Sequence, residues 1–266
     1  MTADDAYSSL LIERRGPIAV VTLNRPQVHN ALDATLVAEI RDVFRSLEAD
    51  ESARGVVLTG SGLSFCAGAD LRWLQSAVTF SEEENRQDAM ALTEMLDAIA
   101  RCPKPVVARV NGAALAGGAG LVAASDIAIA ADTARFGFTE ARLGLVPATI
   151  SPYVVCRIGE SHARSLFLTA ERFEASRAVA IGLVHEVVPA DQLDIAVERT
   201  LRNLLHGGPR ALAENKRLIE GIRDRRGDDL ARYTADTIAR LRVSAEGQEG
   251  LHAFLEKRPP NWALDT

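Results

Sequence analysis

The sequence predicts an α/β protein, and three observations lead to that fold class. The chain has 266 residues, of which 47% are hydrophobic and 25% are charged, an ordinary composition for a globular protein. Short β-rich runs alternate with segments of helical period over its first two thirds, which is typical of sheets joined by crossover helices. Beyond Pro189 the pattern is wholly helical. We therefore expect a core at residues 1–195 and a helical region at residues 196–266.

The elements of the first third follow from hydrophobic period. Residues 10–14 and 18–23 are β-rich runs separated by a Gly-Pro turn pair, so they predict a hairpin. Apolar residues at helical spacing between residues 36 and 47 follow Asp33, a residue type that caps helix N-termini. Residues 55–59 form a continuous apolar run, which predicts a buried strand.

The middle of the chain continues the alternation. Ser81 opens a long helix with three glutamates in its first turn, where the helix dipole favours acids. Two prolines end this helix near Arg101. Residues 106–110 and 126–130 are predicted strands on either side of a Gly-rich segment.

The last part of the chain is predicted to be helical throughout. Apolar residues between 193 and 205 form one helical face, which the Gly-Gly-Pro at residues 207–209 interrupts. Three further helices are predicted before the Pro-Pro at residues 259–260. A unit of about 60 residues buries too little surface to be stable alone. We expect it to pack on the rest of the chain or on another subunit.

Charge and cysteine content exclude several classes of function. The formal net charge is -6, from 36 acidic and 30 basic residues, so no general positive field attracts nucleic acid. Three widely spaced cysteines without a Cys-x-x-Cys pair suggest neither a disulfide framework nor a zinc site. The five histidines show no metal-binding spacing either. We expect no nucleic-acid partner, no metal and a reducing compartment.

Membrane attachment is not expected. Residues 1–9 are acidic and polar and lack the apolar stretch of a targeting segment. Residues 110–125 are uncharged, but a spanning helix needs about 20 apolar residues, and four glycines interrupt this run. The sequence therefore predicts a cytoplasmic protein.

Two segments rich in small residues could hold an anionic oxygen. Residues 64–71 follow a strand, and their small side chains let a ligand approach backbone N–H groups. Residues 111–121 lead into an apolar helix, which leaves N–H groups free around Gly117 and Gly118. This Gly-rich stretch fits neither the Walker loop nor the dinucleotide fingerprint. Tight packing is the alternative for each segment, but two such turns together favour an oxyanion hole.

A third segment, residues 136–147, contains a candidate acid or base. Glu140 lies in apolar surroundings where a strand gives way to a short helix. Burial would raise its pKa toward useful acid/base chemistry, while a helix start would favour the charged form. A surface glutamate that compensates the helix dipole is the alternative.

Together these segments resemble the crotonase, or enoyl-CoA hydratase/isomerase, superfamily over nearly the whole chain. The resemblance implies a ββα spiral core with a C-terminal helical region that assembles trimers, often paired into hexamers. The matching segments are residues 24–26, 30–32, 65–71, 111–121, 136–147, 182–184 and 253–258.

The resemblance also implies a substrate and a set of contacts. The N–H groups of Ala69 and Gly117 would hold the thioester carbonyl of an acyl-CoA and stabilise the enolate that forms there. Coenzyme A enters as part of the substrate, and no separate cofactor is implied. Phe254 and Lys257 match residues that approach the nucleotide from a neighbouring subunit. The positions expected to contact the CoA ester are Arg25, Ala67, Gly68, Asp70, Leu71, Arg72, Trp73, Gly118, Phe254 and Lys257.

One departure from the family pattern bears on the reaction. Typical enoyl-CoA hydratases place two glutamates around a water, and the first of these positions is Gly120 here, while the second is Glu140. A single base suits double-bond isomerisation. Yet residues 118–122, 140–155 and 168–173 resemble bacterial 3-methylglutaconyl-CoA and γ-carboxygeranoyl-CoA hydratases, which also have glycine in place of the first glutamate.

The sequence therefore favours hydration of a short, branched and carboxylated enoyl-CoA, a step of leucine or acyclic terpene breakdown. Glu140 would be the acid/base, and Arg72 is a candidate partner for the distal carboxylate, with a solvated helix arginine as its alternative. A double-bond isomerase, a general enoyl-CoA hydratase and a non-catalytic acyl-CoA-binding protein remain as alternatives. The acyl group, its stereochemistry, the pathway and the choice of trimer or hexamer stay open.

Overall fold

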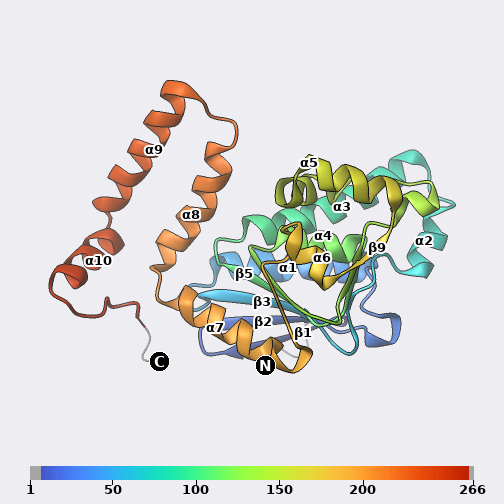
Figure 1. Cartoon of the computed structure of the whole chain (residues 1–266), viewed down its shortest axis with the longest axis horizontal. Helices are drawn as coiled ribbons and strands as arrows, with labels where there is room; N and C mark the ends of the chain where they lie inside the picture. The colour runs from blue at the N-terminus through green and yellow to red at the C-terminus, as the bar shows by residue number, and fades with distance from the viewer. Residues whose placement is uncertain (1–6, 264–266) are drawn as a thin grey trace.

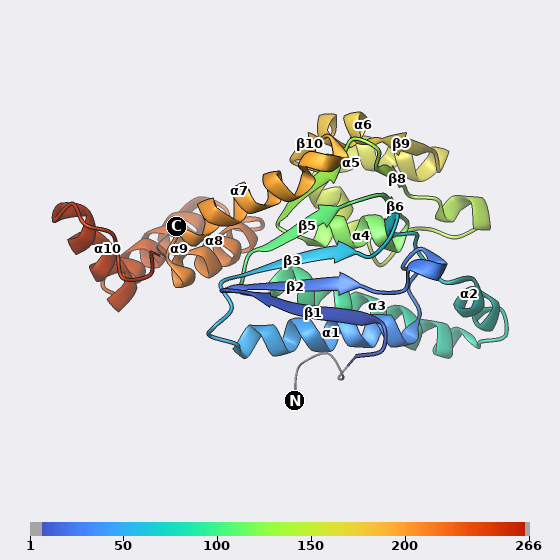
Figure 2. The ribbon, with the colours of Figure 1, turned by 90° about the horizontal axis from the view of Figure 1, so that it is seen from below.

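The larger of two sheets has six strands in the order β1-β2-β3-β5-β7-β10 (Figure 2). The computed structural model describes residues 7–263. The predicted hairpin is confirmed, because β1 and β2 pair antiparallel, and every other neighbouring pair is parallel. The strands are β1 (Leu10–Arg15), β2 (Ile18–Leu23), β3 (Gly55–Gly60), β5 (Val106–Val110), β7 (Ile127–Ala131) and β10 (Glu186–Val188).

Helices cover both faces of this sheet. On one face lie α1 (Ala34–Ala49) and α3 (Glu82–Arg101), and on the other lies α7 (Leu193–Leu205) (Figure 2). The predicted caps are confirmed: the Asp33 side chain accepts the N–H of Leu36, and Ser81 forms a capping box with Glu84.

Alternation along each strand builds two cores. In β2, Ala19, Val21 and Leu23 face the helices α1 and α3, whereas Ile18 and Val20 face α7. The same alternation runs through β3, β5 and β7. Each buried aliphatic side chain contributes about 1.5–3 kcal/mol to the free energy of folding. A slip of register by one residue would move these side chains to the opposite face of the sheet, so it would be strongly unfavourable.

The smaller sheet carries the turns that matter for function. Its order is β4-β6-β8-β9, with the first three strands parallel and β9 antiparallel to β8. Between the two sheets runs α4, all of whose residues after the first are buried. The remaining elements of this part are η2 (Pro26–Val28), β4 (Ser64–Cys66), α2 (Leu71–Ala77), β6 (Ala113–Leu115), α4 (Gly117–Ala124), β8 (Arg135–Gly137), η3 (Glu140–Leu143), α5 (Ser151–Thr169), β9 (Arg172–Glu174), α6 (Ala175–Ala180) and η4 (Ala190–Gln192).

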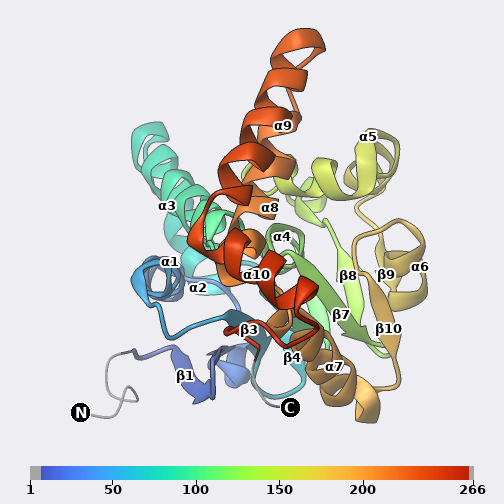
Figure 3. The same cartoon turned by 90° about the vertical axis from the view of Figure 1, so that its left-hand side faces the viewer.

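Three helices project from the core, as Figures 1 and 3 show. They are α8 (Pro209–Ile222), α9 (Gly227–Arg242) and α10 (Ala245–Leu255), which confirms the three helices predicted there. The division expected between residues 195 and 196 lies inside α7, whose apolar face packs on the sheet. The projecting part begins only at Pro209.

Charged groups attach these helices to each other and to the core. Lys216 on α8 donates to Asp126 at 2.7 Å. The buried Glu214 accepts from Arg240 on α9 at 2.7 Å and from Arg217 at 2.9 Å.

An arginine of the core binds both ends of the projecting part. The Arg54 guanidinium donates to the carbonyl oxygens of Gly207 at 2.8 Å and Trp262 at 3.1 Å. The indole N–H of Trp262 donates in turn to the carbonyl of His206. The start and the end of the projecting part are therefore held at one place.

Within residues 7–263, none of the helices has the length and apolar character needed to cross a membrane. Residues 1–6 of the polar N-terminal segment lie outside the described residues.

Candidate active site

Three turns meet at one edge of the smaller sheet. Ala69, Gly117 and Glu140 lie two or three residues beyond the carboxyl ends of β4, β6 and β8, which are adjacent and parallel. The turns after β6 and β8 are joined directly, since the N–H of Ala116 donates to the carbonyl of Gly137 at 2.8 Å. Ligand sites in α/β proteins favour such an edge.

The N–H of Ala69 is free because of how its neighbours bond. Leu32 donates to the carbonyl of Gly68 at 2.7 Å and accepts from the N–H of Asp70 at 2.8 Å. In such a parallel bridge the N–H of the central residue points away from the partner strand. Ala69 is exposed, and among residues 7–263 no group accepts its N–H.

The N–H of Gly117 is free for a different reason. Gly117 is the first residue of α4, and the first N–H groups of a helix have no partner within it. No acceptor for this N–H occurs in the described part of the chain. Ala69 and Gly117 thus each present a free N–H after adjacent parallel strands, and groups of this kind can stabilise an anionic oxygen.

Close packing fixes these turns against each other. A Cβ at Gly118 would overlap the carbonyl oxygen of Cys66 and lie 2.9 Å from the Cβ of Cys66. Ala116 has φ +48° and ψ -118°, a conformation that L-residues rarely adopt. Strained backbone of this kind persists only where its surroundings impose it.

Arg25 ties the first turn to the loop before α1. Its guanidinium donates to Asp70 at 2.9 Å and to the carbonyl of Ala31, and it forms an ion pair with Asp33 at 2.9 Å. The Asp70 side chain also accepts the N–H of Arg72 and so caps α2. Although burial alone would raise the pKa of Asp70, these donors hold it below its ordinary value. The charge of Arg25 is balanced within the protein.

Asn30 has a positioning role that the sequence did not reveal. It is fully buried with φ +55°, and its side chain accepts from the N–H of Arg25 and donates to the carbonyls of Ser61 and Ser64. These bonds hold the loop against β4. The tolerance of asparagine for positive φ was the one signal available in the sequence.

Glu140 begins the short helix η3, as expected. Its Oε2 is buried and has no hydrogen-bond partner among the described residues. Burial raises the pKa of Glu140 above its ordinary value, because a carboxylate without solvent or a cation is poorly stabilised. The helix start does not reverse this shift, so the carboxyl is suited to proton transfer.

Most of the other expected contacts lie near Ala69. The N–H of Ala67 is taken by the carbonyl of His29, and Leu71 and Arg72 are exposed on α2. Trp73 is half-buried, and its indole N–H donates to Asp88 on α3 at 2.9 Å. The structure thus places these residues beside the turn that contains Ala69.

Phe254 and Lys257 lie elsewhere. Phe254 is 81% exposed on α10, and Lys257 follows that helix, on the side of the molecule away from α2 (Figures 1 and 2). Within one chain, they do not meet the three turns.

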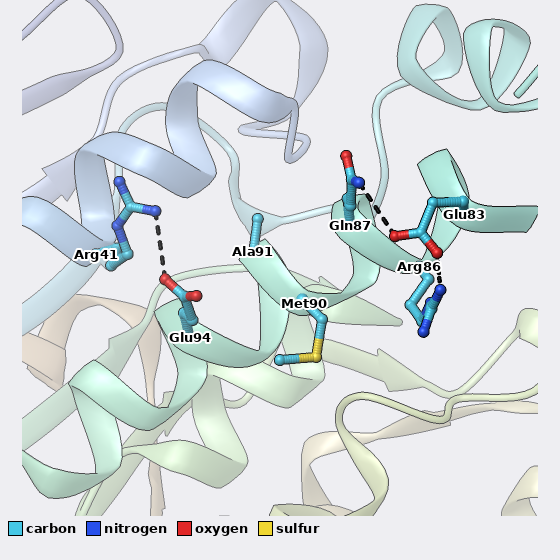
Figure 4. A pocket seen from close by; sticks show the side chains of 7 residues that line it. All are labelled: Arg41, Glu83, Arg86, Gln87, Met90, Ala91 and Glu94. Carbon is cyan, nitrogen blue, oxygen red and sulfur yellow. Dashed lines mark hydrogen bonds and ion pairs between the residues drawn. The ribbon is translucent and has the colours of Figure 1, made fainter.

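A surface hollow on α1 and α3 is separate from this site. Its volume is about 460 Å³, and Figure 4 shows its charged and polar lining side chains paired with one another. Arg41 donates to Glu94 at 3.5 Å, and Gln87 donates to Glu83 at 3.1 Å. No residue of the three turns lines it.

The described residues give the three turns no cluster of metal ligands and no ionised thiol. Within residues 7–263 there is no cluster of three or more histidine, cysteine, aspartate or glutamate residues placed to hold a metal ion. Burial raises the pKa of Cys66 to about 12, so its thiol stays protonated at neutral pH.

Comparison with known proteins identifies the family. A family model described as enoyl-CoA hydratase/isomerase matches residues 13–264. The chain belongs to this family. Crotonyl-CoA hydratase of Syntrophomonas wolfei is 33% identical over 259 residues, which cover 97% of this chain and 98% of that protein.

Solved structures agree with this membership of the crotonase superfamily. An enoyl-CoA hydratase from Shewanella pealeana has a TM-score of 0.95 and 38% identity, over 97% of each chain. A Legionella pneumophila structure described as enoyl-CoA hydratase/isomerase (crotonase) has a TM-score of 0.88 and 47% identity, over 96% of this chain and 99% of that one. The protein is an enzyme of the enoyl-CoA hydratase/isomerase family.

We predict that Arg25→Met lowers the free energy of unfolding by about 2 kcal/mol, because it leaves the buried carboxylate of Asp70 without its cation. Urea unfolding measures the effect. Arg164→Met is the matched control, since Arg164 also pairs with a carboxylate but is 70% exposed. Equal losses in the two variants would contradict the role assigned to Arg25.

Proposed function

We propose that this enzyme hydrates a short, branched enoyl-CoA that carries a second carboxylate, of the 3-methylglutaconyl type. The observation that carries the proposal is the combination of one desolvated carboxyl, Glu140, with two free N–H groups at the same sheet edge. The substrate class rests on the segments that resemble hydratases of carboxylated acyl groups and on the absence of a side chain at Gly120.

The proposed reaction adds one water across the double bond. The Glu140 carboxylate takes a proton from water, and the water oxygen forms a bond to the β-carbon. The π electrons of the double bond move toward the thioester oxygen, where the N–H groups of Ala69 and Gly117 stabilise the enolate. The proton on Glu140 then passes to the α-carbon as the carbonyl reforms. The product contains the added water, and no other reactant is consumed.

A cation is needed near the site for the distal carboxylate of the substrate. Arg72 is exposed on α2, which directly follows the turn that contains Ala69. No described carboxylate forms an ion pair with Arg72, in contrast to Arg25, whose charge is already used. An uncommitted arginine can pair with a carboxylate of the ligand in bidentate geometry.

Double-bond isomerisation is the second candidate reaction, and one observation favours it. Moving a proton between two carbons requires one base, and Glu140 is the one acid on the three described turns with a buried, unpartnered oxygen. In that reaction the same enolate forms, but no oxygen is added. The two candidates therefore differ in product.

We predict that Glu140→Gln abolishes turnover, with kcat reduced by about 10²-fold or more, because the amide cannot carry the proton. Crotonyl-CoA, a 3-enoyl-CoA and methylglutaconyl-CoA are assayed in parallel by absorbance and by product mass. We expect the unaltered enzyme to give a hydrated product, 18 mass units heavier by one added water, from methylglutaconyl-CoA in preference to the other two.

Glu160→Gln is the control for this assay, since Glu160 is an exposed acid on α5. Full activity in Glu140→Gln would refute the role of Glu140. A product of unchanged mass from the 3-enoyl-CoA would establish the isomerase instead.

The pH dependence follows from the raised pKa of Glu140. The reaction starts from the carboxylate, so kcat/KM should fall as pH falls through the pKa of this group in the free enzyme. That pKa should lie above the ordinary value of 4.5 because burial penalises the charge. Activity that stays level down to about pH 4.5, in an enzyme that remains folded, would contradict the assignment.

We also propose that the chain forms a trimer or a pair of trimers through its projecting helices. The adjacent residues Phe254 and Leu255 expose 81% and 74% of their surface on α10, so together they offer an apolar surface that a neighbouring subunit could cover. A neighbour placed there would bring Lys257 to the nucleotide of the CoA ester. Light scattering should give three or six times the chain mass of 28.6 kDa, and a monomer would contradict the proposal.

A further inference from the structure

Position 120 is closed by a side chain from another part of the chain. Gly120 is fully buried in α4, three residues after Gly117 and thus on the same face of the helix. A Cβ at Gly120 would overlap Cγ2 of Ile150 and lie 2.9 Å from the Cβ of Ile150. Leu96 of α3 lies 3.8 Å from the same point. Any side chain at position 120 would therefore collide with Ile150.

Ile150 cannot easily move aside. It is 1% exposed, and its β-branched side chain has few allowed rotamers. Its backbone leads directly into α5, where the N–H of Val154 donates to the carbonyl of Ile150 at 3.1 Å. The side chain of Val154 is itself fully buried. The Ile150 side chain is thus part of the packed core.

The residues around position 120 are apolar, which also disfavours an acid there. A carboxylate at position 120 would face Ile150 and Leu96, two apolar side chains that offer no hydrogen bond. Burial of an acid in such surroundings is strongly unfavourable unless a partner compensates the charge. A second acid beside the Gly117 turn is therefore disfavoured for two reasons. Ile150 occupies the space that its side chain needs, and the apolar neighbours offer no partner for its charge.

We infer that Ile150 is a specificity-determining residue, which keeps the site to a single carboxylate by occupying the space at position 120. For its substrate class this inference rests on the proposed function. With no second acid to orient water, an acyl group that brings its own carboxylate is favoured over an uncharged, unbranched one. Ile150 thus selects the substrate without touching the thioester oxygen or the proton on Glu140.

A cycle of stability measurements tests the contact itself. Gly120→Ala should lower the melting temperature by about 4 °C or more in the unaltered chain, because the added methyl group overlaps Ile150. In an Ile150→Gly background the same change should raise the melting temperature, because the methyl group then fills a cavity. Ile150→Val is the matched control: it retains Cγ2, so Gly120→Ala should remain destabilising.

Substrate selection is measured in a second set of variants. The quantity measured is kcat/KM for crotonyl-CoA divided by kcat/KM for methylglutaconyl-CoA. This ratio should be at least about tenfold higher in the double variant Gly120→Glu/Ile150→Gly than in Ile150→Gly, because the added acid can orient water. Gly120→Glu alone should give no such rise. Where Ile150→Gly is too unstable to purify, Ile150→Ala takes its place, since it removes Cγ2 and leaves only the 2.9 Å approach of Cβ.

The outcomes separate this inference from the proposed function. A Gly120→Ala effect of the same sign and size in all backgrounds would overturn the contact. A rise below about tenfold in the double variant, or an equal rise in Gly120→Glu alone, would overturn the role in specificity. Absence of methylglutaconyl-CoA hydration in the unaltered enzyme would overturn the proposed function, while the stability cycle would still report on Ile150.

Discussion

The parallel pairing of β4, β6 and β8 is the constraint on which the site depends. Each strand has only three residues, yet the register joins Cys66 to Ala114 and Leu115 to Gly137. Because the strands run the same way, the turns that follow them must emerge at one edge. Two of those turns present free N–H groups, and the third presents a carboxyl. The site proposed for the reaction depends on this arrangement of the backbone.

Such short strands hold a precise site because their surroundings support them. The turn after β4 is secured by Leu32 on one side and by Arg25 and Asp70 on the other. The turn after β6 is fixed by its bond to Gly137 and by contact with Cys66. Preorganised donors stabilise developing charge better than mobile ones, since they need no rearrangement as the reaction proceeds. The polar network around Arg25 therefore holds the turn that contains Ala69 in place.

Local patterns in the sequence were sufficient for much of the fold but not for all of the site. The hairpin, the Asp33 cap and the Ser81 capping box were predictable because their residues are neighbours in sequence. Free N–H groups were predictable for residues 64–71 and 111–121 because each segment follows a strand, but the family resemblance singled out Ala69, and its bridge to Leu32 is visible only in the structure. The contact of Ile150 with Gly120 joins positions 30 residues apart, and no period or motif encodes it. The division of the chain was expected too early because α7, although helical like its successors, packs on the sheet.

The bond between Arg54 and Trp262 has a consequence for how the protein is made. It joins residues 208 positions apart and closes the base of the projecting helices. Ribosomal synthesis proceeds from the N-terminus, so this bond forms only after residue 262 has been translated. The core can bury its sheet earlier, since its strands and α7 all precede residue 206. The orientation of the projecting helices is therefore fixed later in synthesis than the sheet of the core.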